Sequence, residues 1–403
     1  MSTEDAALAT FREQIRSWLP EVCPPSLKPG SDTTPSAEDR QAWLEAFAER
    51  GYTTPTWPKE YGGGGLSKQE VAVLNEEVTR FGVMPPGVSF FGTVMLGPVL
   101  LEFGNEEQKQ KHLRDITFGR VQWCQGYSEP GAGSDLAGLQ TRAVRDGEQF
   151  IVNGSKIWTS MADQADWIFC LVRTDPDAAK HDGISFLLFD LHQPGVTISP
   201  IQLISGQSDF CQVFFEDAKA EASNLVGPLN GGWTIAKRLL QHERQTLSGG
   251  MPGGESPTPK KGGASEVPAP TSPLAEDARA YLGTEGDRLA DPALRDRIAQ
   301  YELDKLCFGL TLKRNGQEAK AGQGTSAASS MFKLYASEMN KRRGEIQMST
   351  RGAAALGWEG EGFSSNEIME TRGWLRSKGN SIEGGTSEVQ LNVIAKRVLG
   401  LPD

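Results

Sequence analysis

Cysteine and histidine are scarce in this sequence, and neither is spaced as a metal site or a disulfide framework requires. The chain of 403 residues has 5 cysteines and 4 histidines. No two cysteines form a Cys-x-x-Cys pair, and the histidines show no His-Glu-x-x-His or similar zinc-binding spacing. We therefore expect no bound metal and no disulfide framework. Scattered free thiols favour a reducing, cytoplasmic compartment.

Basic residues and long apolar runs are scarce as well. Lys and Arg number 41 against 52 Asp and Glu, which gives a net charge of −11 and argues against a protein that binds the phosphate backbone of nucleic acids. No apolar run approaches the ~20 residues of a membrane-spanning helix. The sequence begins Met1-Ser2-Thr3-Glu4-Asp5, where a secretory signal would carry basic residues. We expect no nucleic-acid partner, no membrane partner and no secretion.

The first third of the sequence has the period of amphipathic helices. Apolar residues recur at three- and four-residue steps along residues 8–19, and we expect that helix to end at Pro20, where a proline-rich stretch begins. Another helix is expected from Glu106 to Leu113. Two Ser-x-x-acid pairs have the spacing of capping boxes and predict further helix starts: Ser36 with Asp39, and Ser67 with Glu70.

The middle of the sequence changes to short runs rich in β-branched and aromatic residues, separated by Gly, Pro and Asp. The runs cover residues 150–152, 167–172, 184–189 and 211–215. They predict an antiparallel β-domain, and the helical period returns from Trp233 onward. A segment dense in Gly, Pro, Ser and Lys, Gly249 to Pro273, is expected to be a mobile surface loop.

This order of elements predicts an α+β protein in which a sheet domain stands between two helical regions. We expect an N-terminal helical domain over residues 1–119 and a middle antiparallel β-domain over residues 120–229. A C-terminal helical domain resembling a four-helix bundle would span residues 230–403.

The densest polar and glycine-rich stretch runs from Tyr127 to Gly138. Its glycines let a ligand approach the main chain, and its hydroxyls and peptide N–H groups offer hydrogen bonds. It lacks the G-x-G-x-x-G spacing, and the Walker and G-x-S-x-G patterns are absent from the chain. Composition alone therefore leaves open an ordinary polar loop. The next polar segment places Trp158, a flat aromatic residue, directly before Thr159 and Ser160, which favours a ligand.

Taken together, these segments resemble the acyl-CoA dehydrogenase family. The matching stretches are Glu129-Pro130-Gly131-Ala132-Gly133-Ser134-Asp135, then Asn153-Gly154-x-Lys156-x-Trp158, and near the end Gly385-Thr386-Ser387-Glu388 followed by Arg397-Val398-Leu399-Gly400. The resemblance covers nearly the whole chain. It implies the fold of that family and an FAD-dependent reaction, in which an acyl-CoA thioester loses an α-proton to a base and a β-hydride to flavin N5.

The resemblance also implies a role for each matching residue. The flavin ring edge would be hydrogen-bonded by Gln125, Tyr127 and Ser128. The ring face would lie against Trp158, and its far edge would meet Thr159 and Ser160. The ribityl and phosphate region would be wrapped by Gly385, Thr386, Ser387 and Glu388. Ser134 would face the pantetheine of coenzyme A.

The position of the base is a departure from many family members. These carry it in the C-terminal loop, where this sequence has Gly384, whose N–H can still polarise the thioester carbonyl. Another subgroup carries a Glu-Arg pair on a helix after the β-domain, and the sequence has Gln241-His242-Glu243-Arg244 there. We interpret Glu243 as the base, with Gln241 and Arg244 beside the substrate.

The helical period supports this interpretation independently. One stripe contains Ala236, Leu239, Leu240, Glu243 and Leu247. A carboxylate on an otherwise apolar face loses hydration, and its pKa tends to rise toward the range of a general base. The alternative, that Glu243 simply pairs with a nearby arginine, stays open.

A second departure concerns the assembly. The Arg-x-x-Phe-Gly segment of straight-chain members is missing from residues 288–297. In this the sequence resembles divergent bacterial members that form α2β2 heterotetramers, so a homo- or heterotetramer is expected, with an electron-transfer flavoprotein as electron acceptor. Two alternatives remain: a non-catalytic partner subunit of such a complex, and a flavin oxidase or monooxygenase on the same fold.

Overall fold

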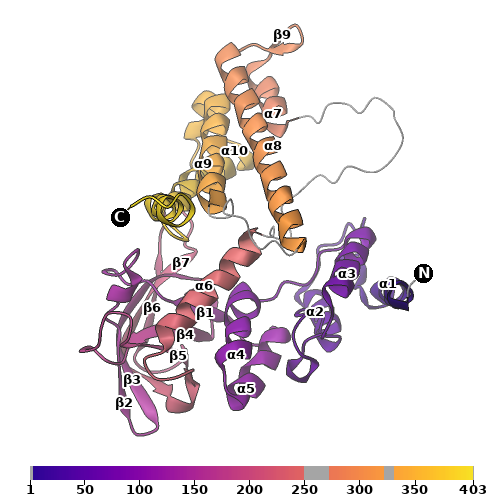
Figure 1. Cartoon of the computed structure of the whole chain (residues 1–403). Coiled ribbons are helices and arrows are strands. Elements are labelled where there is room, and N and C mark those ends of the chain that lie inside the picture. Colours follow the sequence, from indigo (N-terminus) through magenta and orange to yellow (C-terminus); the bar gives the residue numbers. More distant parts are fainter. Residues whose placement is uncertain (1–2, 249–271, 322–330, 403) are drawn as a thin grey trace. The chain divides into compact units, whose positions relative to one another are not determined.

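The computed structural model describes the backbone of residues 3–248, 272–321 and 331–402 (Figure 1). The chain divides into two compact units, Met1–Pro200 with Phe210–Glu243 and Ile201–Asp209 with Arg244–Asp403. The expected order is confirmed, because a helical N-terminal part is followed by a sheet and then by a second helical part. Among the described residues, none of the helices has the length and apolar character that crossing a membrane requires.

The first unit opens with helices. They are α1 (Thr3–Val22), α2 (Ala37–Glu49), α3 (Lys68–Phe81), α4 (Gly97–Phe103) and α5 (Glu106–Thr117). Both capping boxes are confirmed: the Ser36 and Ser67 hydroxyls accept from the N–H groups of Asp39 and Glu70, whose carboxylates accept in return. Such reciprocal bonds satisfy donors that a helix N-terminus otherwise leaves free.

Two helix ends differ from the expectation. α1 does not stop at Pro20 but continues to Val22. A proline costs least so close to a C-terminus, because few intrahelical bonds remain to be lost beyond it. α5 extends past Leu113 to Thr117, whose hydroxyl donates to the Leu113 carbonyl at 3.1 Å.

The sheet of the first unit has the order β6-β7-β3-β2-β4-β5-β8, with β1 added beside β4. The strands are β1 (Trp123–Gly126), β2 (Arg142–Asp146), β3 (Gln149–Ser160), β4 (Trp167–Arg173), β5 (Ile184–Asp190), β6 (Val196–Ile201), β7 (Phe210–Glu221) and β8 (Leu225–Val226). The pairs β3–β7, β2–β3 and β4–β5 are antiparallel, as expected. Two pairings differ from the expectation, since β1 runs parallel to β4 with Trp123 opposite Trp167, and β2 is paired parallel to β4 at Arg142 and Arg173.

Both faces of the central strands are covered, which explains their continuous apolar runs. On one face, Phe169 and Leu171 of β4 join a core with α4, α5 and α6 (Gly232–Ser248). On the other face, Ile168 and Cys170 pack with side chains of β3 and β7.

The second unit is a group of helices with a short hairpin. Its elements are α7 (Pro273–Leu282), β9 (Thr284–Glu285), β10 (Arg288–Leu289), α8 (Pro292–Lys320), α9 (Phe332–Arg351), α10 (Ser365–Ser377) and α11 (Ser387–Val393). Its core is built around Leu294, Ile298 and Ile346. The expected loop from Gly249 falls almost wholly outside the described residues, and its last residue, Pro273, instead begins α7.

Candidate active site

The segment assigned to the flavin ring edge begins within β1 and continues past its end. Gln125 lies within the strand opposite Phe169 and is half-buried. Tyr127 is buried and Ser128 is half-buried. The N–H of Ile157 donates to the Ser128 carbonyl at 2.9 Å, so this segment is joined to β3. The structure thus brings the ring-edge residues next to the strand that carries Trp158.

Trp158 has a backbone conformation that is rare for a bulky residue. Its φ is 59°, and the pairing of β3 with β7 shifts register between Lys156 and Thr159. Its side chain is 53% exposed and meets the Phe210 ring edge-on at 6.1 Å between centroids. A left-handed φ at such a residue is strained and persists only where the surroundings enforce it. Trp158 is therefore presented to solvent by a bulge and is not a core residue.

Thr159 shows the reverse combination. It is fully buried, yet its hydroxyl finds no hydrogen-bond partner among the residues that the structure describes. Ser160 follows and is half-buried opposite Phe210. A buried hydroxyl without a partner is costly and calls for an explanation. A ligand with a hydrogen-bonding edge would provide one, so this pair of residues fits a flavin.

A buried ion pair connects the two motifs that the sequence comparison singled out. The Lys156 side chain has an exposed fraction of 0% and that of Glu129 one of 7%, and their charged atoms lie 2.7 Å apart. Burial alone would raise the pKa of Glu129, but the Lys156 charge and the hydrogen bonds to the carboxylate hold that pKa below its usual value. Both residues belong to the quoted motifs, but no local pattern of the sequence indicates that they touch.

Ser134, expected near the pantetheine, is exposed on the glycine-rich loop. The neighbouring Asp135 carboxylate pairs with Lys180 from the loop between β4 and β5. A Cβ added at Gly131 or Gly133 would meet no atom within 4 Å. This part of the loop therefore has open space beside its main chain.

The helix assigned to the base is α6. Ala236 and Leu239 are buried and Leu240 packs against the same core, which confirms the start of the predicted apolar stripe. Gln241 is exposed and accepts from Arg238 at 3.2 Å. Glu243 and Arg244 fall on the same helix, but their side chains lie outside the described residues.

The C-terminal residues assigned to the ribityl and phosphate region lie in the second unit. Gly384 and Gly385 have φ values of 63° and 90°, which favour glycine. Thr386 caps α11 by accepting from the Val389 N–H. Ser387 donates to Glu338 at 3.3 Å, and the pKa of Glu388 is lowered by hydrogen bonds with its own N–H and with Thr386.

Lys333 of α9 is a residue of this region that the sequence did not point to. Its Nζ donates to the carbonyls of Asn380 and Gly385, at 2.8 Å each. Burial lowers its pKa. The ammonium group therefore fixes the loop that carries the two glycines, and no local pattern predicts this because the contact joins residues far apart in the chain.

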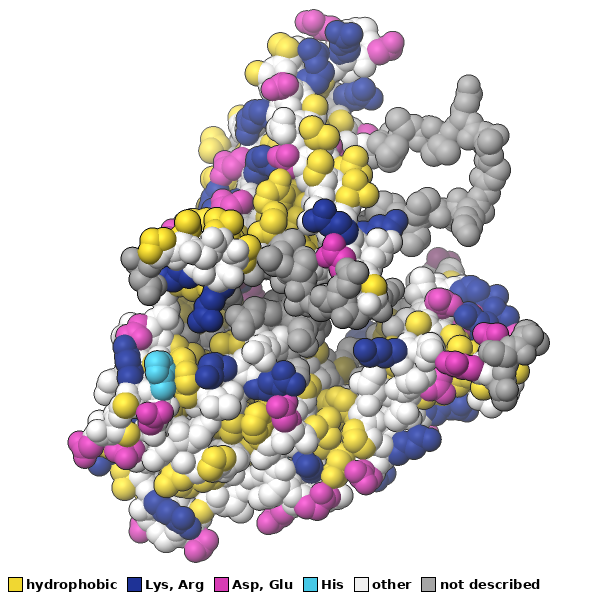
Figure 2. All heavy atoms as spheres, viewed as in Figure 1, with side chains coloured by type: hydrophobic (Ala, Val, Ile, Leu, Met, Phe, Trp, Pro, Cys, Tyr) yellow, Lys and Arg dark blue, Asp and Glu magenta, His cyan; other side chains and the backbone are white. Residues whose placement is uncertain are grey.

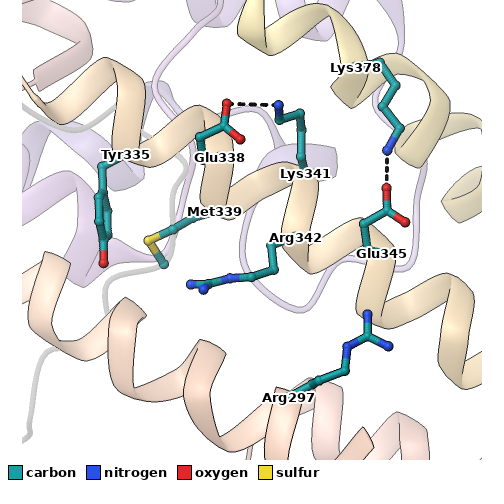
Figure 3. A pocket seen from close by; sticks show the side chains of 8 residues that line it. All are labelled: Arg297, Tyr335, Glu338, Met339, Lys341, Arg342, Glu345 and Lys378. Atoms are coloured by element: carbon teal, nitrogen blue, oxygen red, sulfur yellow. Dashed lines mark hydrogen bonds and ion pairs between the residues drawn. The ribbon is translucent and has the colours of Figure 1, made fainter. Parts of the chain in front are cut away.

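A charged hollow of about 550 Å³ lies between α8 and α9 (Figure 3). None of the residues predicted for the site lines it. Three of its cations pair with carboxylates: Lys341 with Glu338, Lys378 with Glu345, and Arg342 with Asp304. The fourth, Arg297, donates to the Ser349 hydroxyl. The hollow is thus a groove of paired charges, and the candidate active site lies elsewhere.

Along the chain a helical part, a sheet and a second helical part follow one another, and an exposed aromatic residue precedes a buried hydroxyl that lacks a partner among the described residues at a strand bulge. Family models for the N-terminal, middle and C-terminal domains of acyl-CoA dehydrogenases match residues 5–120, 124–218 and 275–399 in that order. The chain belongs to the acyl-CoA dehydrogenase family and is an oxidoreductase. This family is generally flavin-dependent.

Individual relatives agree with this assignment. Acyl-CoA dehydrogenase IpdE1 of Mycobacterium tuberculosis is 36% identical over 410 residues, covering 97% of each chain. Among solved structures, the Tcur3481-Tcur3483 steroid acyl-CoA dehydrogenase is 32% identical with a TM-score of 0.69, covering 98% of each chain. The ChsE4-ChsE5 complex from Mycobacterium tuberculosis is 27% identical with a TM-score of 0.68, again covering 98% of each chain.

Proposed function

We propose that this acyl-CoA dehydrogenase binds FAD and removes hydrogens from the α- and β-carbons of an acyl-CoA thioester. The observation that carries the proposal is the end of β3, where exposed Trp158 in a left-handed conformation precedes the buried, unpartnered Thr159 hydroxyl of the described structure. Strained backbone and unsatisfied polar groups are unfavourable in a fold and concentrate at ligand sites. When bound, FAD would supply the acceptor for the β-hydride.

The contacts proposed for each unit are those that the resemblance to the family implies. In the first unit, Gln125, Tyr127 and Ser128 would bind one edge of the ring. Trp158 would lie against its face, and the hydroxyls of Thr159 and Ser160 would bind the other edge. In the second unit, Gly385, Thr386, Ser387 and Glu388 would hold the ribityl and phosphate region. Ser134 would contact the pantetheine.

Glu243 is proposed to accept the α-proton on its carboxylate, with Gln241 and Arg244 beside the thioester. Position 243 follows Leu239 and Leu240 on one stripe of α6, and Leu239 is buried. Gly384 has no side chain that could accept a proton, although its N–H could polarise the thioester carbonyl. Removal of the α-proton by a carboxylate leaves charge on the thioester oxygen, which a peptide N–H is suited to stabilise.

For the substrate we propose a bulky acyl-CoA of steroid origin. The proposal is supported by the similarity to the Tcur3481-Tcur3483 steroid acyl-CoA dehydrogenase, which is 32% identical and covers 98% of this chain.

For the assembly we propose a tetramer, with an electron-transfer flavoprotein as electron acceptor. Two solved relatives, Tcur3481-Tcur3483 and the ChsE4-ChsE5 complex, are named as pairs of different proteins, which supports an assembly of more than one subunit. α8 also carries a row of exposed leucines, Leu303, Leu306 and Leu310, whose exposed fractions are 54%, 60% and 57%. Figure 2 shows hydrophobic side chains over this helix. An exposed apolar row of this kind is typical of a surface that a partner covers. A companion subunit without its own activity is the second candidate, which Gly384 favours.

The test is a screen of acyl-CoA thioesters with a dye acceptor, comparing the wild-type chain with Glu243→Gln. We expect the variant to keep its yellow flavin and to lose turnover by about 10² to 10⁴-fold, the usual contribution of a general base. Glu216→Gln, which alters an exposed carboxylate of β7, should leave turnover unchanged. Normal turnover of Glu243→Gln refutes the base, and a colourless, inert wild type favours the companion subunit.

A further inference from the structure

A fully buried lysine lies among the residues that we assign to the flavin ring. Lys156 is on β3, and its Nζ donates to a carboxylate oxygen of Glu129 at 2.7 Å and to the Tyr127 carbonyl at 3.1 Å. The exposed fraction of its side chain is 0%. An ammonium group reaches such a place only when its charge and its donors are matched. The two acceptors therefore account for its burial.

The carboxylate of Glu129 is equally well satisfied. Besides the ammonium group, it accepts from the peptide N–H of Thr141 at 2.9 Å and from that of Gln140 at 2.6 Å. These donors keep the carboxylate charged although it is buried, in line with its lowered pKa. Replacing Lys156 alone would leave this charge without its partner, which is strongly destabilising in a buried pair.

The bonds of this pair join segments that come from different parts of the chain. Tyr127 follows β1, Lys156 belongs to β3, and Thr141 precedes β2. Two further bonds tie the same segments together, from Ile157 N–H to the Ser128 carbonyl at 2.9 Å and from the Thr141 hydroxyl to the Ser155 carbonyl at 3.2 Å. The positions of the peptides after Tyr127 and Lys156 therefore depend on the ion pair.

Lys156 also marks the point where β3 leaves its regular pairing. It is paired with Val213, and the register shift to Thr159 follows immediately. Trp158, with its left-handed φ of 59°, lies within this shift. A bulge of this kind redirects a side chain, and a strained conformation within it persists only where the surrounding structure enforces it. The anchor on the Lys156 side is the buried ammonium group.

We propose that Lys156 and Glu129 are positioning residues of the flavin site. The pair turns the Tyr127 carbonyl inward and fixes the bulge, so that Ser128 on one side and Trp158 with Thr159 on the other meet the ring in a defined geometry. This inference rests on the proposed function, because it assigns these residues to the flavin. It predicts that the bond to Tyr127, apart from the charge balance, determines flavin affinity.

The bond from Lys156 to the Tyr127 carbonyl and the charge balance with Glu129 can be separated by variants of the whole chain. Lys156→Met removes the bond to Tyr127 and leaves the Glu129 charge unpaired. Lys156→Met combined with Glu129→Gln also removes the bond to Tyr127 but leaves no buried charge, and the glutamine oxygen can still accept from a peptide N–H. Glu77→Gln is the control, because Glu77 is a 2% exposed carboxylate paired with Arg12, Arg16 and Arg80 in the N-terminal helices.

The apoprotein of each variant is titrated with FAD, following the flavin fluorescence and visible spectrum, and its thermal unfolding is recorded separately. We expect the double variant to regain thermal stability relative to Lys156→Met while its dissociation constant for FAD stays about tenfold or more above the wild type, the effect of one lost well-placed hydrogen bond. Its flavin spectrum should differ from that of the wild type. Glu77→Gln should lose stability and keep its FAD affinity.

Three results would overturn the proposal. The double variant could bind FAD with wild-type affinity and spectrum, or its FAD affinity could rise above that of Lys156→Met in step with its thermal stability. The third is a loss of FAD affinity in Glu77→Gln as large as that in the double variant. If Lys156→Met does not fold, the double variant decides alone. A wild type that binds no FAD under the same conditions overturns the proposed function and this inference with it, a result distinct from the other three.

Discussion

Replacing Thr159 by valine should stabilise the apoprotein and weaken flavin binding at the same time. The side chain is fully buried, and its hydroxyl has no hydrogen-bond partner among the described residues. Valine has nearly the same shape, is favoured in strands, and removes the unsatisfied group. An unpaired buried hydroxyl costs about 1 to 3 kcal/mol, so we expect the free energy of unfolding to rise by about 1 kcal/mol once imperfect packing of the new methyl is allowed for.

The matched control is the same substitution at Thr117. That residue is also fully buried, but its hydroxyl donates to the Leu113 carbonyl at 3.1 Å and lies 3.1 Å from the Thr54 hydroxyl. Thr117→Val removes these bonds and leaves the Thr54 hydroxyl with fewer partners, so it should destabilise the protein by about 1 to 3 kcal/mol. Both substitutions remove a fully buried hydroxyl, bonded at Thr117 and unpartnered at Thr159, and valine is in addition less favoured in α5 than in β3.

The assay is chemical unfolding of the apoprotein followed by circular dichroism, together with FAD titration of the folded variants. Thr159→Val should raise the dissociation constant for FAD by about tenfold, because a hydrogen bond to the ring edge is lost. If Thr159→Val destabilises the apoprotein as much as Thr117→Val, the Thr159 hydroxyl is structurally engaged. Our reasoning about an unpartnered group is then refuted.

Three further outcomes are expected. Trp158→Gly should be more stable than Trp158→Ala by about 1 kcal/mol in thermal unfolding, because only glycine adopts a left-handed φ without strain, and equal stabilities would contradict the bulge. Hydrogen bonds from Arg16 lower the pKa of Glu77 from 4.5 to about 2, so its stabilising effect is complete above about pH 4.5 and is lost as the pH falls toward 2; Glu77→Gln should flatten this part of the thermal stability curve. Leu306→Glu should leave folding intact, since Leu306 is 60% exposed, but should weaken subunit association in size-exclusion chromatography, and unaltered association would exclude this face of α8 from an interface.

Features that depend on neighbouring residues were predictable from the sequence. The capping boxes at Ser36 and Ser67 are local, because each donor and acceptor lie within one helical turn. The apolar runs of β4 and β5 were recognisable because both faces of these strands are buried. The motif resemblance added the family, which the family models confirm over all three parts of the chain.

Features that depend on distant contacts were not predictable. β1 has four residues and runs parallel to β4, so its sequence is too short to carry a period. The bond between Lys156 and Glu129 joins residues 27 positions apart, and that between Lys333 and Gly385 joins residues 52 positions apart. No local pattern reports such pairs, because each of the charged residues alone has the sequence environment of an ordinary surface charge.

Several unusual features of the first unit's sheet lie close together in one short part of β3. Within residues 156–159 there are a buried ammonium group, a left-handed aromatic residue, a register shift and an unpartnered hydroxyl. The left-handed residue and the unpartnered hydroxyl lower the stability of the free protein, and a sheet could avoid both by continuing its regular pairing through these positions. Natural sequences keep such departures chiefly where a ligand interaction compensates for them. This clustering is a structural observation that does not depend on the sequence motif. The motif, read on its own, assigns the flavin to the same residues, and the agreement supports the assignment of this strand to the cofactor.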